Sequence, residues 1–492
     1  MNRARLVPWL ALIAGAALYS LIGWKWNVAA AAWLAPALLV FHFRRQSRWY
    51  ATLPAVALLW AVSYVNKVGS WDMDPMFEVL ALGLATLPLV TALYLDRYAA
   101  RRLPTLPGTL VFPAAFVGAD YLFAMLPFGT VFSIAVTQVY LTPLVQVAAI
   151  TGIWGIGFLV LWTAPVMNAW MEAGFDVRPV RAPLLALAGS AAAMLVLGGL
   201  RVALDRPTSP TVRVAGVTVP HPRDYWAEVI DLGTPRDKAA ALAGEFASLT
   251  DQLFEESARA ARAGAKVVFW SEANAFLLPE AKDAFLQRAR EFAREHGIYL
   301  VPAYQVLRYG DTSGFNALAM IAPDGRLAFE YEKTMSWYAT TSDGQLRSIS
   351  TPFGRLSAVI CFDMDFPALI RQAASQGVDI MLVPAFDTYA TRVYHSEVGL
   401  LRAVENGFSM VRMVNEGASL AADYRGNILA YQDHFTTESR VMTADVPTRG
   451  VSTLYGRLGD WLAWLCLALT AVTVTAAARP ARSRLAPRPQ AA

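Results

Sequence analysis

Apolar positions are unevenly distributed along the chain, and their two distributions predict two kinds of structure. Residues 6–204 are mostly continuous apolar blocks, and another block occupies 460–478. Blocks of this length and composition are typical of helices that cross a lipid bilayer. The expected spans are 6–24, 27–43, 51–65, 76–95, 109–126, 144–170, 183–204 and 460–478. We therefore expect about eight transmembrane helices.

Residues 211–450 have a different pattern, in which short apolar runs alternate with amphipathic segments. Alternation of this kind predicts an α/β layered domain, and two hairpin turns, Asp324-Gly325 and Arg425-Gly426, indicate more antiparallel strands than a doubly wound sheet has. The expected strands are 212–219, 267–270, 299–304, 317–321, 327–331, 356–360, 380–384 and 409–414, and the expected helices are 238–263, 280–295, 368–376 and 396–406.

The predicted organisation is therefore a membrane domain at 1–205 with about seven helices, an α/β domain at 211–450, a transmembrane helix at 459–478 and a basic tail at 479–492. Residues 1–24 could instead be a cleaved signal peptide. Trp24-Lys25-Trp26 is typical of a membrane interface and no small-residue cleavage pattern precedes it, so we favour an uncleaved helix.

Arginines follow alternate spans, and this bias predicts the orientation of the chain. Arginine-rich loops lie on the cytoplasmic side of a membrane. The expected orientation puts both termini in the cytoplasm and the α/β domain outside it. The arginines concerned are Arg3, Arg5, Arg44, Arg45, Arg48, Arg97, Arg101, Arg102, Arg178, Arg181, Arg479, Arg482, Arg484 and Arg488. Topology also explains the net charge of +4, so we expect no nucleic-acid partner.

Only two cysteines occur among the 492 residues, and they fall in different regions. Cys466 lies within the last predicted span, so Cys361 has no partner for a disulfide inside the α/β domain. A buried core cysteine is the ordinary interpretation of such a residue. A catalytic thiol is the alternative, because an unpaired thiol outside the cytoplasm is otherwise a liability.

Two other polar residues occupy the same kind of position as Cys361, at the end of a short strand-like run. Glu272 follows the run from 266, and Lys333 follows the second arm of the first hairpin. Alone, each would be interpreted as a surface residue, with Lys333 neutralised by Glu330 and Glu332. Together, a base, a cation and a thiol at strand ends predict one site for acyl chemistry, because strand ends meet at the same edge of a sheet.

The whole chain resembles the apolipoprotein N-acyltransferase family, the membrane branch of the carbon–nitrogen hydrolase (nitrilase-like) superfamily. The segments that carry the resemblance are Pro113–Asp120, Thr151–Phe158, Val212–Val217, Trp270-Ser271-Glu272, His395–Gly407, Val411–Gly417 and Thr453–Asp460. The resemblance implies an extracytoplasmic α-β-β-α sandwich on a multi-pass helical domain in a bacterial cytoplasmic (inner) membrane. It also implies a Glu-Lys-Cys triad formed by Glu272, Lys333 and Cys361.

In that interpretation, Cys361 is the nucleophile, Glu272 the general base and Lys333 the cation that stabilises thiolate and oxyanion, with a backbone N–H near Phe362. The implied partners are a phospholipid acyl donor, a diacylated lipoprotein acceptor and the surrounding membrane lipids. No cofactor is implied. The five histidines show no metal-ligand spacing, so we expect no metal site.

The sequence departs from the family pattern around the expected acyl-binding region. Phe362-Asp363 stands where the family has an aromatic–acidic pair with a tyrosine and a glutamate, and segment 334–343 lacks a second glutamate. Asp363 could assist the nucleophile or cap a turn, and Asp343 could replace the missing carboxylate or belong to a turn. Trp226 and Trp337 are candidates for a lipid entrance, with ordinary packing as the alternative.

These departures leave three functions open: lipoprotein N-acyl transfer, an amidase or acyltransferase with a different amine acceptor, and a membrane scaffold that retains the fold. The complete Glu-Lys-Cys set argues against the scaffold.

Overall fold

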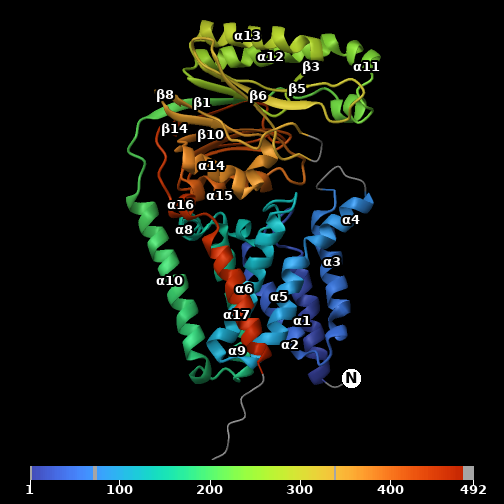
Figure 1. The fold of residues 1–492 in the computed structure, drawn as a ribbon, viewed down its shortest axis with the longest axis vertical. Helices are drawn as coiled ribbons and strands as arrows, with labels where there is room; N and C mark the ends of the chain where they lie inside the picture. The colour runs from blue at the N-terminus through green and yellow to red at the C-terminus, as the bar shows by residue number, and fades with distance from the viewer. Residues whose placement is uncertain (1–2, 70–74, 337–339, 480–492) are drawn as a thin grey trace, which may run out of the picture.

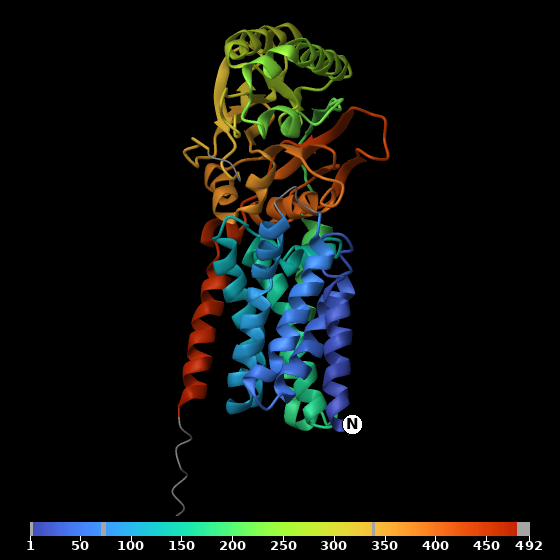
Figure 2. The ribbon, with the colours of Figure 1, turned by 90° about the vertical axis from the view of Figure 1, so that its right-hand side faces the viewer.

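A computed structural model describes residues 3–69, 75–336 and 340–479. The molecule is elongated, with a bundle of helices at one end and an α/β domain stacked on it (Figure 1). Two connections join these parts: α10 leads up into β1, and the chain returns from β14 through α16 into α17 (Figure 1). Figure 2 shows the helices of the bundle standing side by side beneath the α/β domain.

Helices occupy every segment in which a span was expected. Among the described residues, five helical stretches are long and apolar enough to cross a membrane: Glu78–Arg102, Thr105–Ala124, Ile153–Glu172, Arg178–Leu204 and Trp461–Ala478. The helices are α1 (Arg3–Tyr19), α2 (Ala29–Arg45), α3 (Leu53–Lys67), α4 (Pro75–Leu84), α5 (Leu87–Ala99), α6 (Thr105–Ala124), α7 (Thr142–Val145), α8 (Ala148–Thr151), α9 (Ile153–Glu172), α10 (Arg181–Leu204), α16 (Leu454–Leu458) and α17 (Trp461–Ala478).

The segment expected at 144–170 is divided, whereas a single helix was predicted. It contains α7, α8 and α9, with Gly152 between the last two at φ +66°. A side chain at Gly152 would lie 2.6 Å from the Tyr455 ring, so only glycine allows this close approach. The break turns the chain where the helical bundle meets the return segment from the α/β domain.

Two sheets form the middle of the α/β domain. In the described part of the chain, one sheet has the order β14-β1-β2-β4-β6-β5-β3, with β7 on β6, and the other has the order β13-β12-β11-β10-β9-β8. The strands are β1 (Thr211–Val217), β2 (Val267–Trp270), β3 (Ala275–Leu277), β4 (Tyr299–Val301), β5 (Ala303–Val306), β6 (Phe315–Ile321), β7 (Leu327–Glu332), β8 (Ser348–Thr351), β9 (Gly354–Ala358), β10 (Ile380–Phe386), β11 (Ser409–Asn415), β12 (Ala418–Ala422), β13 (Ile428–Asp433) and β14 (Val441–Pro447).

Helices cover the outer face of each sheet, which gives the expected α-β-β-α sandwich. α12 (Ala243–Arg262) and α13 (Lys282–His296) lie at the far end of the molecule, and α14 (Pro367–Gln376) and α15 (Tyr394–Asn406) lie between the second sheet and the bundle (Figure 1). The sheets pack closely, since a side chain at Gly216 would lie 2.6 Å from Met413 Cβ. Every residue of α15 is buried, because the sheet covers one face and the bundle the other.

Polar contacts join the bundle to the α/β domain at this layer. Thr130 donates to the Asp365 carbonyl from both its backbone N–H and its hydroxyl, each at 2.8 Å. The Ile153 N–H donates to Glu405 Oε1 at 2.7 Å, which satisfies a donor at the start of α9. The turn that contains Asp365 begins at Cys361, so the bundle directly supports the segment that carries the candidate nucleophile.

Candidate active site

The three expected residues lie at neighbouring strand ends. Glu272 follows β2, Lys333 follows β7 directly, and Cys361 begins the 3₁₀ turn Cys361–Asp365 after β9. Cys361 is 7% exposed and Glu272 is 3% exposed, so both are largely withdrawn from water. Their placement follows from the topology, because β2 and β9 belong to facing sheets whose ends converge.

Glu272 is fixed by three hydrogen-bond donors. Its Oε1 accepts from Lys333 Nζ at 2.6 Å and from Asn316 Nδ2 at 2.8 Å, and its Oε2 accepts from the Phe386 N–H at 3.0 Å. The Lys333 N–H also donates to the Asn316 carbonyl at 2.9 Å, so the lysine continues the β6–β7 hairpin by one residue. The carboxylate and the ammonium therefore form a rigid buried ion pair.

The backbone of the same residue, Phe386, contacts both Glu272 and the thiol. Cys361 Sγ lies 3.4 Å from the Phe386 carbonyl, to which it donates a hydrogen bond. Phe386 ends β10 and thereby links the sulfur and the carboxylate through its C=O and its N–H. Cys361 has a φ of +47°, an unfavourable backbone conformation for a residue with a side chain, and such strain is concentrated at functional sites.

The electrostatic setting keeps the resting thiol protonated. Burial raises the pKa of Cys361 well above its ordinary value, the Glu272 charge raises it further, and the Lys333 charge opposes both. For Lys333, burial lowers the pKa, but attraction to Glu272 outweighs this effect and the pKa is raised. The site therefore contains a neutral thiol beside a lysine that carries its charge, and forming the thiolate requires a base.

A second ion pair, which the sequence analysis missed, lies beside the sulfur. Arg412 Nη2 lies 3.9 Å from Cys361 Sγ and 2.9 Å from each carboxylate oxygen of Asp387. Arg412 is fully buried within β11. A signal existed in the sequence, because an arginine inside an otherwise uncharged strand requires a buried partner.

Asp363 ties the nucleophile turn to the lysine loop. Its Oδ2 accepts from the Ile360 N–H at 3.0 Å and from the Tyr331 hydroxyl at 2.8 Å, and its Oδ1 accepts from the Met335 N–H at 2.7 Å. Burial raises the pKa of Asp363 to about 6, and these hydrogen bonds oppose the rise. These contacts indicate that Asp363 positions the Cys361–Asp365 turn against the segment around Lys333.

The remaining candidates lie further from the triad or outside the described residues. Trp226 lies in the π-helical turn Trp226–Ile230, with its ring 6.1 Å from that of Phe276. Trp337 lies outside the described residues. Asp343 is exposed and pairs with Arg347, so the geometry favours the turn interpretation for it over a replacement carboxylate.

Aromatic rings connect the nucleophile turn to the helical bundle. Phe362 follows Cys361, and its ring lies 6.2 Å from that of His395, which lies 6.1 Å from that of Tyr394. Tyr394 stacks on Trp24 at 5.3 Å, and Trp24 stacks on Phe132 at 5.5 Å. His395 Nδ1 also lies 3.1 Å from Asp365 Oδ2. Burial lowers the pKa of His395, but the Asp365 charge outweighs this effect and the pKa is raised.

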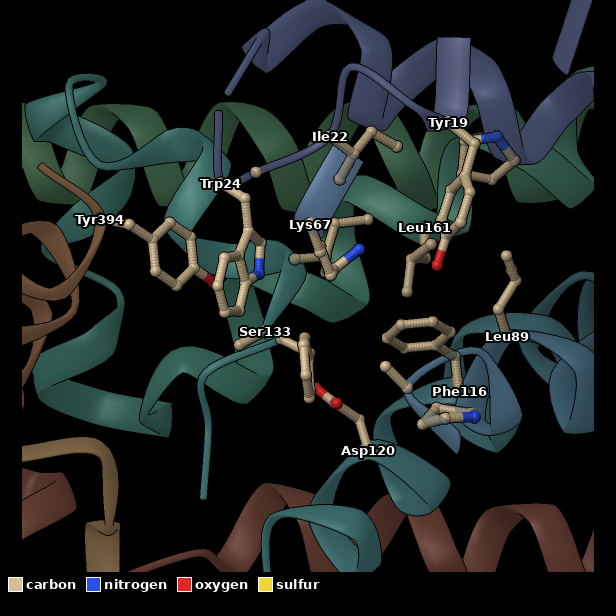
Figure 3. Close-up of a pocket in the computed structure, with 16 residues that line it drawn as sticks. Tyr19, Ile22, Trp24, Lys67, Leu89, Phe116, Asp120, Ser133, Leu161 and Tyr394 are labelled. Carbon is tan, nitrogen blue, oxygen red and sulfur yellow. The ribbon is translucent and has the colours of Figure 1, made fainter. Parts of the chain in front are cut away.

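The stacked rings end at a small cavity of about 40 Å³ among the helices, with a few polar side chains in a mostly apolar lining. In Figure 3 the Tyr19 hydroxyl and the Lys67 amine face one another across this cavity, and Asp120 enters from another side. Lys67 donates to the Ser63 hydroxyl at 3.0 Å, and within the described ranges no hydrogen bond or ion pair reaches the Asp120 carboxylate. Buried ionisable groups in a helical bundle are costly and mark functional regions.

Comparison with known proteins agrees with this geometry. The sequence model of the carbon-nitrogen hydrolase family matches residues 234–454, and that of the apolipoprotein N-acyltransferase N-terminal domain matches residues 11–166. An apolipoprotein N-acyltransferase of Geobacter metallireducens is 26% identical over 461 residues, covering 86% of this chain and 84% of that protein. That of Chlorobaculum tepidum is 25% identical over 492 residues, covering 86% and 85%.

This chain belongs to the apolipoprotein N-acyltransferase family. It is a membrane N-acyltransferase of the carbon–nitrogen hydrolase superfamily, as its sequence motifs predicted. Among solved structures, an amidase from Nesterenkonia sp. aligns at 20% identity with a TM-score of 0.39, covering 49% of this chain and 92% of that one. Within residues 3–69, 75–336 and 340–479, no three His, Cys, Asp or Glu side chains are arranged to bind a metal ion.

Proposed function

We propose that this enzyme moves a fatty acyl chain from a phospholipid, through a thioester on Cys361, to the α-amino group of a diacylglyceryl-cysteine lipoprotein. The observation that carries the proposal is the Glu272–Lys333 ion pair, which is linked to the Cys361 thiol through the backbone of Phe386: its N–H donates to Glu272 and its carbonyl accepts from Cys361. The names of the relatives supply the lipoprotein acceptor.

In the first half-reaction, Glu272 removes the thiol proton as Cys361 Sγ attacks the ester carbonyl of the phospholipid. A carbon–sulfur bond forms, and Lys333 Nζ stabilises the negative charge that develops on the carbonyl oxygen. The carbon–oxygen bond of the ester then breaks. Glu272 returns its proton to the departing alkoxide, which leaves as a lysophospholipid.

In the second half-reaction, the acceptor amine attacks the thioester carbonyl and loses a proton to Glu272. The carbon–sulfur bond breaks as the amide forms, and the sulfur recovers the proton from Glu272. Arg412 and Asp387 remain paired throughout, since each neutralises the other beside the sulfur. The kinetics are therefore ping-pong.

The same proposal includes the orientation of the chain. The arginine bias supports cytoplasmic termini and an extracytoplasmic α/β domain in the bacterial inner membrane. The bundle supports the turn that carries Cys361 through the hydrogen bonds of Thr130 to the Asp365 carbonyl, so in this orientation the turn lies near the membrane surface that supplies the lipid ester.

The test is single-turnover labelling of the full-length protein in detergent micelles. Labelled phospholipid is expected to give a hydroxylamine-sensitive adduct on Cys361 that a diacylated lipopeptide discharges as an amide. Cys361→Ala removes the adduct, whereas the matched variant Cys466→Ala retains it, because Cys466 lies in α17. Loading without discharge to the lipopeptide would favour a different amine acceptor. Absence of loading would overturn the proposal.

A further inference from the structure

A second cavity, of about 400 Å³, lies at the two connections between the helical bundle and the α/β domain. Its walls come from the last three turns of α10, from the α7–α8 segment and from residues 451–454, which lead into α16. It shares no lining residue with the Glu-Lys-Cys site or with the cavity in Figure 3. Its position indicates a role separate from catalysis.

Two polar atoms of lining residues are buried without a hydrogen-bond partner in the described part of the chain. One is Arg201 Nη1, a donor, and the other is Gln146 Oε1, an acceptor. Arg201 Nε lies 3.6 Å from Asp205 Oδ2, and Gln146 Nε2 donates to the Thr142 and Arg425 carbonyls at 3.1 and 2.8 Å. An unpaired buried donor and acceptor are costly, so their presence in one cavity indicates a ligand.

The rest of the cavity is apolar and reaches the lipid-facing surface. Leu197 and Leu454 line it and are 60% and 45% exposed. α10 is an apolar helix of spanning length, of which only 11% is buried inside the protein. Arg201 lies at the end of this helix next to the α/β domain, the level at which lipid headgroups meet water.

We propose that this cavity binds a membrane phospholipid, with a phosphodiester oxygen accepting from Arg201 Nη1 and an acyl chain along the apolar wall beside α10. A headgroup hydroxyl or ammonium group donates to Gln146 Oε1. Because Asp205 already balances the charge of Arg201, the phosphate group is recognised and not the net charge of the lipid. Zwitterionic and anionic phospholipids both fit, whereas diacylglycerol lacks the phosphodiester oxygens.

The bound lipid would stabilise the junction on which the α/β domain rests. The cavity lies between the end of α10 and the return segment, where the Val451 N–H donates to the Gly407 carbonyl at 2.7 Å and the Thr453 hydroxyl donates to the Glu405 carbonyl. Gly407 and Glu405 close the C-terminal end of α15. A lipid that contacts both connections therefore raises the stability of the folded state by mass action.

The experiment measures the unfolding temperature of delipidated, full-length Cys361→Ala protein in detergent, where no acyl donor can be consumed. We expect dioctanoyl phosphatidylethanolamine, whose ammonium group can donate to Gln146 Oε1, to raise this temperature, and dioctanoylglycerol and inorganic phosphate to have no comparable effect. Arg201→Gln is expected to shift the half-maximal lipid concentration upward about tenfold. Ala193→Trp, which fills the cavity from an exposed position on α10, gives a second loss of response. Arg181→Gln, at the opposite end of α10, is the matched control and keeps the full response.

The proposal is overturned if both cavity variants respond as the parent does, if dioctanoylglycerol stabilises equally, or if inorganic phosphate alone reproduces the effect. Acyl loading of Arg201→Gln with Cys361 intact is expected to match the wild type for each folded molecule. A failure of loading at Cys361 therefore bears on the proposed function alone, and a failure of the lipid response bears on this cavity alone.

Discussion

Replacing Glu272 by Gln tests whether this carboxylate is both the base and the counterion of the site. Both carboxylate oxygens of Glu272 act as acceptors. Oε1 accepts from Lys333 Nζ and Asn316 Nδ2, and Oε2 accepts from the Phe386 N–H. A glutamine must place its NH₂ group against one set of these donors. Either orientation loses hydrogen bonds and leaves the Lys333 charge uncompensated.

The size of the effect follows from the burial of the pair. The side chains of Lys333 and Glu272 are 15% and 5% exposed. Removing one partner of a buried pair costs about 3–5 kcal/mol of stability. Loss of a general base independently slows the chemical step by about 10²–10⁴-fold. Glu272→Gln should therefore lower both the unfolding free energy and the single-turnover rate of acyl loading on Cys361.

The assay compares loading rates for each folded molecule, with the folded fraction taken from thermal unfolding of the same sample. Glu330→Gln is the matched control, because Glu330 also pairs with a lysine, Lys282 at 2.7 Å, but outside the site and 30% exposed. Its pair is worth about 0–1 kcal/mol, and loading should be unchanged. If Glu272→Gln does not fold, Glu272→Asp keeps the charge and shortens the reach. Wild-type loading by folded Glu272→Gln would refute the reasoning.

Three further predictions follow from the site and from the cavity in the bundle. Because the pKa of Cys361 is raised, its alkylation by iodoacetamide, measured against Cys361→Ala by mass spectrometry, should still be accelerating at pH 9; a plateau below pH 8 would contradict this. The pKa of Asp363 is raised from 3.8 to about 6, so the protonated carboxyl stabilises the folded state fully below pH 3.8, and this contribution is lost as pH rises through 6. Asp363→Asn should therefore flatten the dependence of the unfolding free energy on pH between these values, as measured by chemical denaturation. An unchanged slope would count against the raised pKa of Asp363. Asp120→Asn removes a buried charge without an ion pair among the described residues and should raise the unfolding temperature, whereas a fall would indicate a partner for the carboxylate.

Most of the fold could be predicted because its signals are local. Continuous apolar blocks predicted the helical bundle, and alternation predicted the strands and helices of the α/β domain. The errors have two sources: a tertiary contact in one case and a local signal that was overlooked in the other. The break at Gly152 depends on the approach of Tyr455, which is distant in sequence. The expected strand 299–304 is two strands, β4 and β5, because Pro302 lies between them and has no N–H to donate.

The candidate site was predictable only in part, for a similar reason. Strand-end position and chemistry pointed to Glu272, Lys333 and Cys361, and the structure pairs the first two and links Glu272 to Cys361 through the backbone of Phe386. Arg412 and Asn316 were missed because each lies within a strand, where sequence patterns predict packing rather than contact with a reactive group. The role of Asp363 was left open because its three donors come from separate segments.

The geometry explains how one ammonium group can serve two anions in succession. At rest, Lys333 pairs with the ionised Glu272 while the thiol is neutral. In the proposed mechanism, Glu272 accepts the thiol proton and loses its charge, and the sulfur, then the substrate oxygen, becomes the anion. The total charge of the site is unchanged, so Lys333 can stabilise the new anion without the entry of another cation. Arg412 cannot take this role, because its pair with Asp387 persists through the proton transfer. Neutralising Lys333 should therefore slow acyl loading more than neutralising Arg412 and Asp387 together.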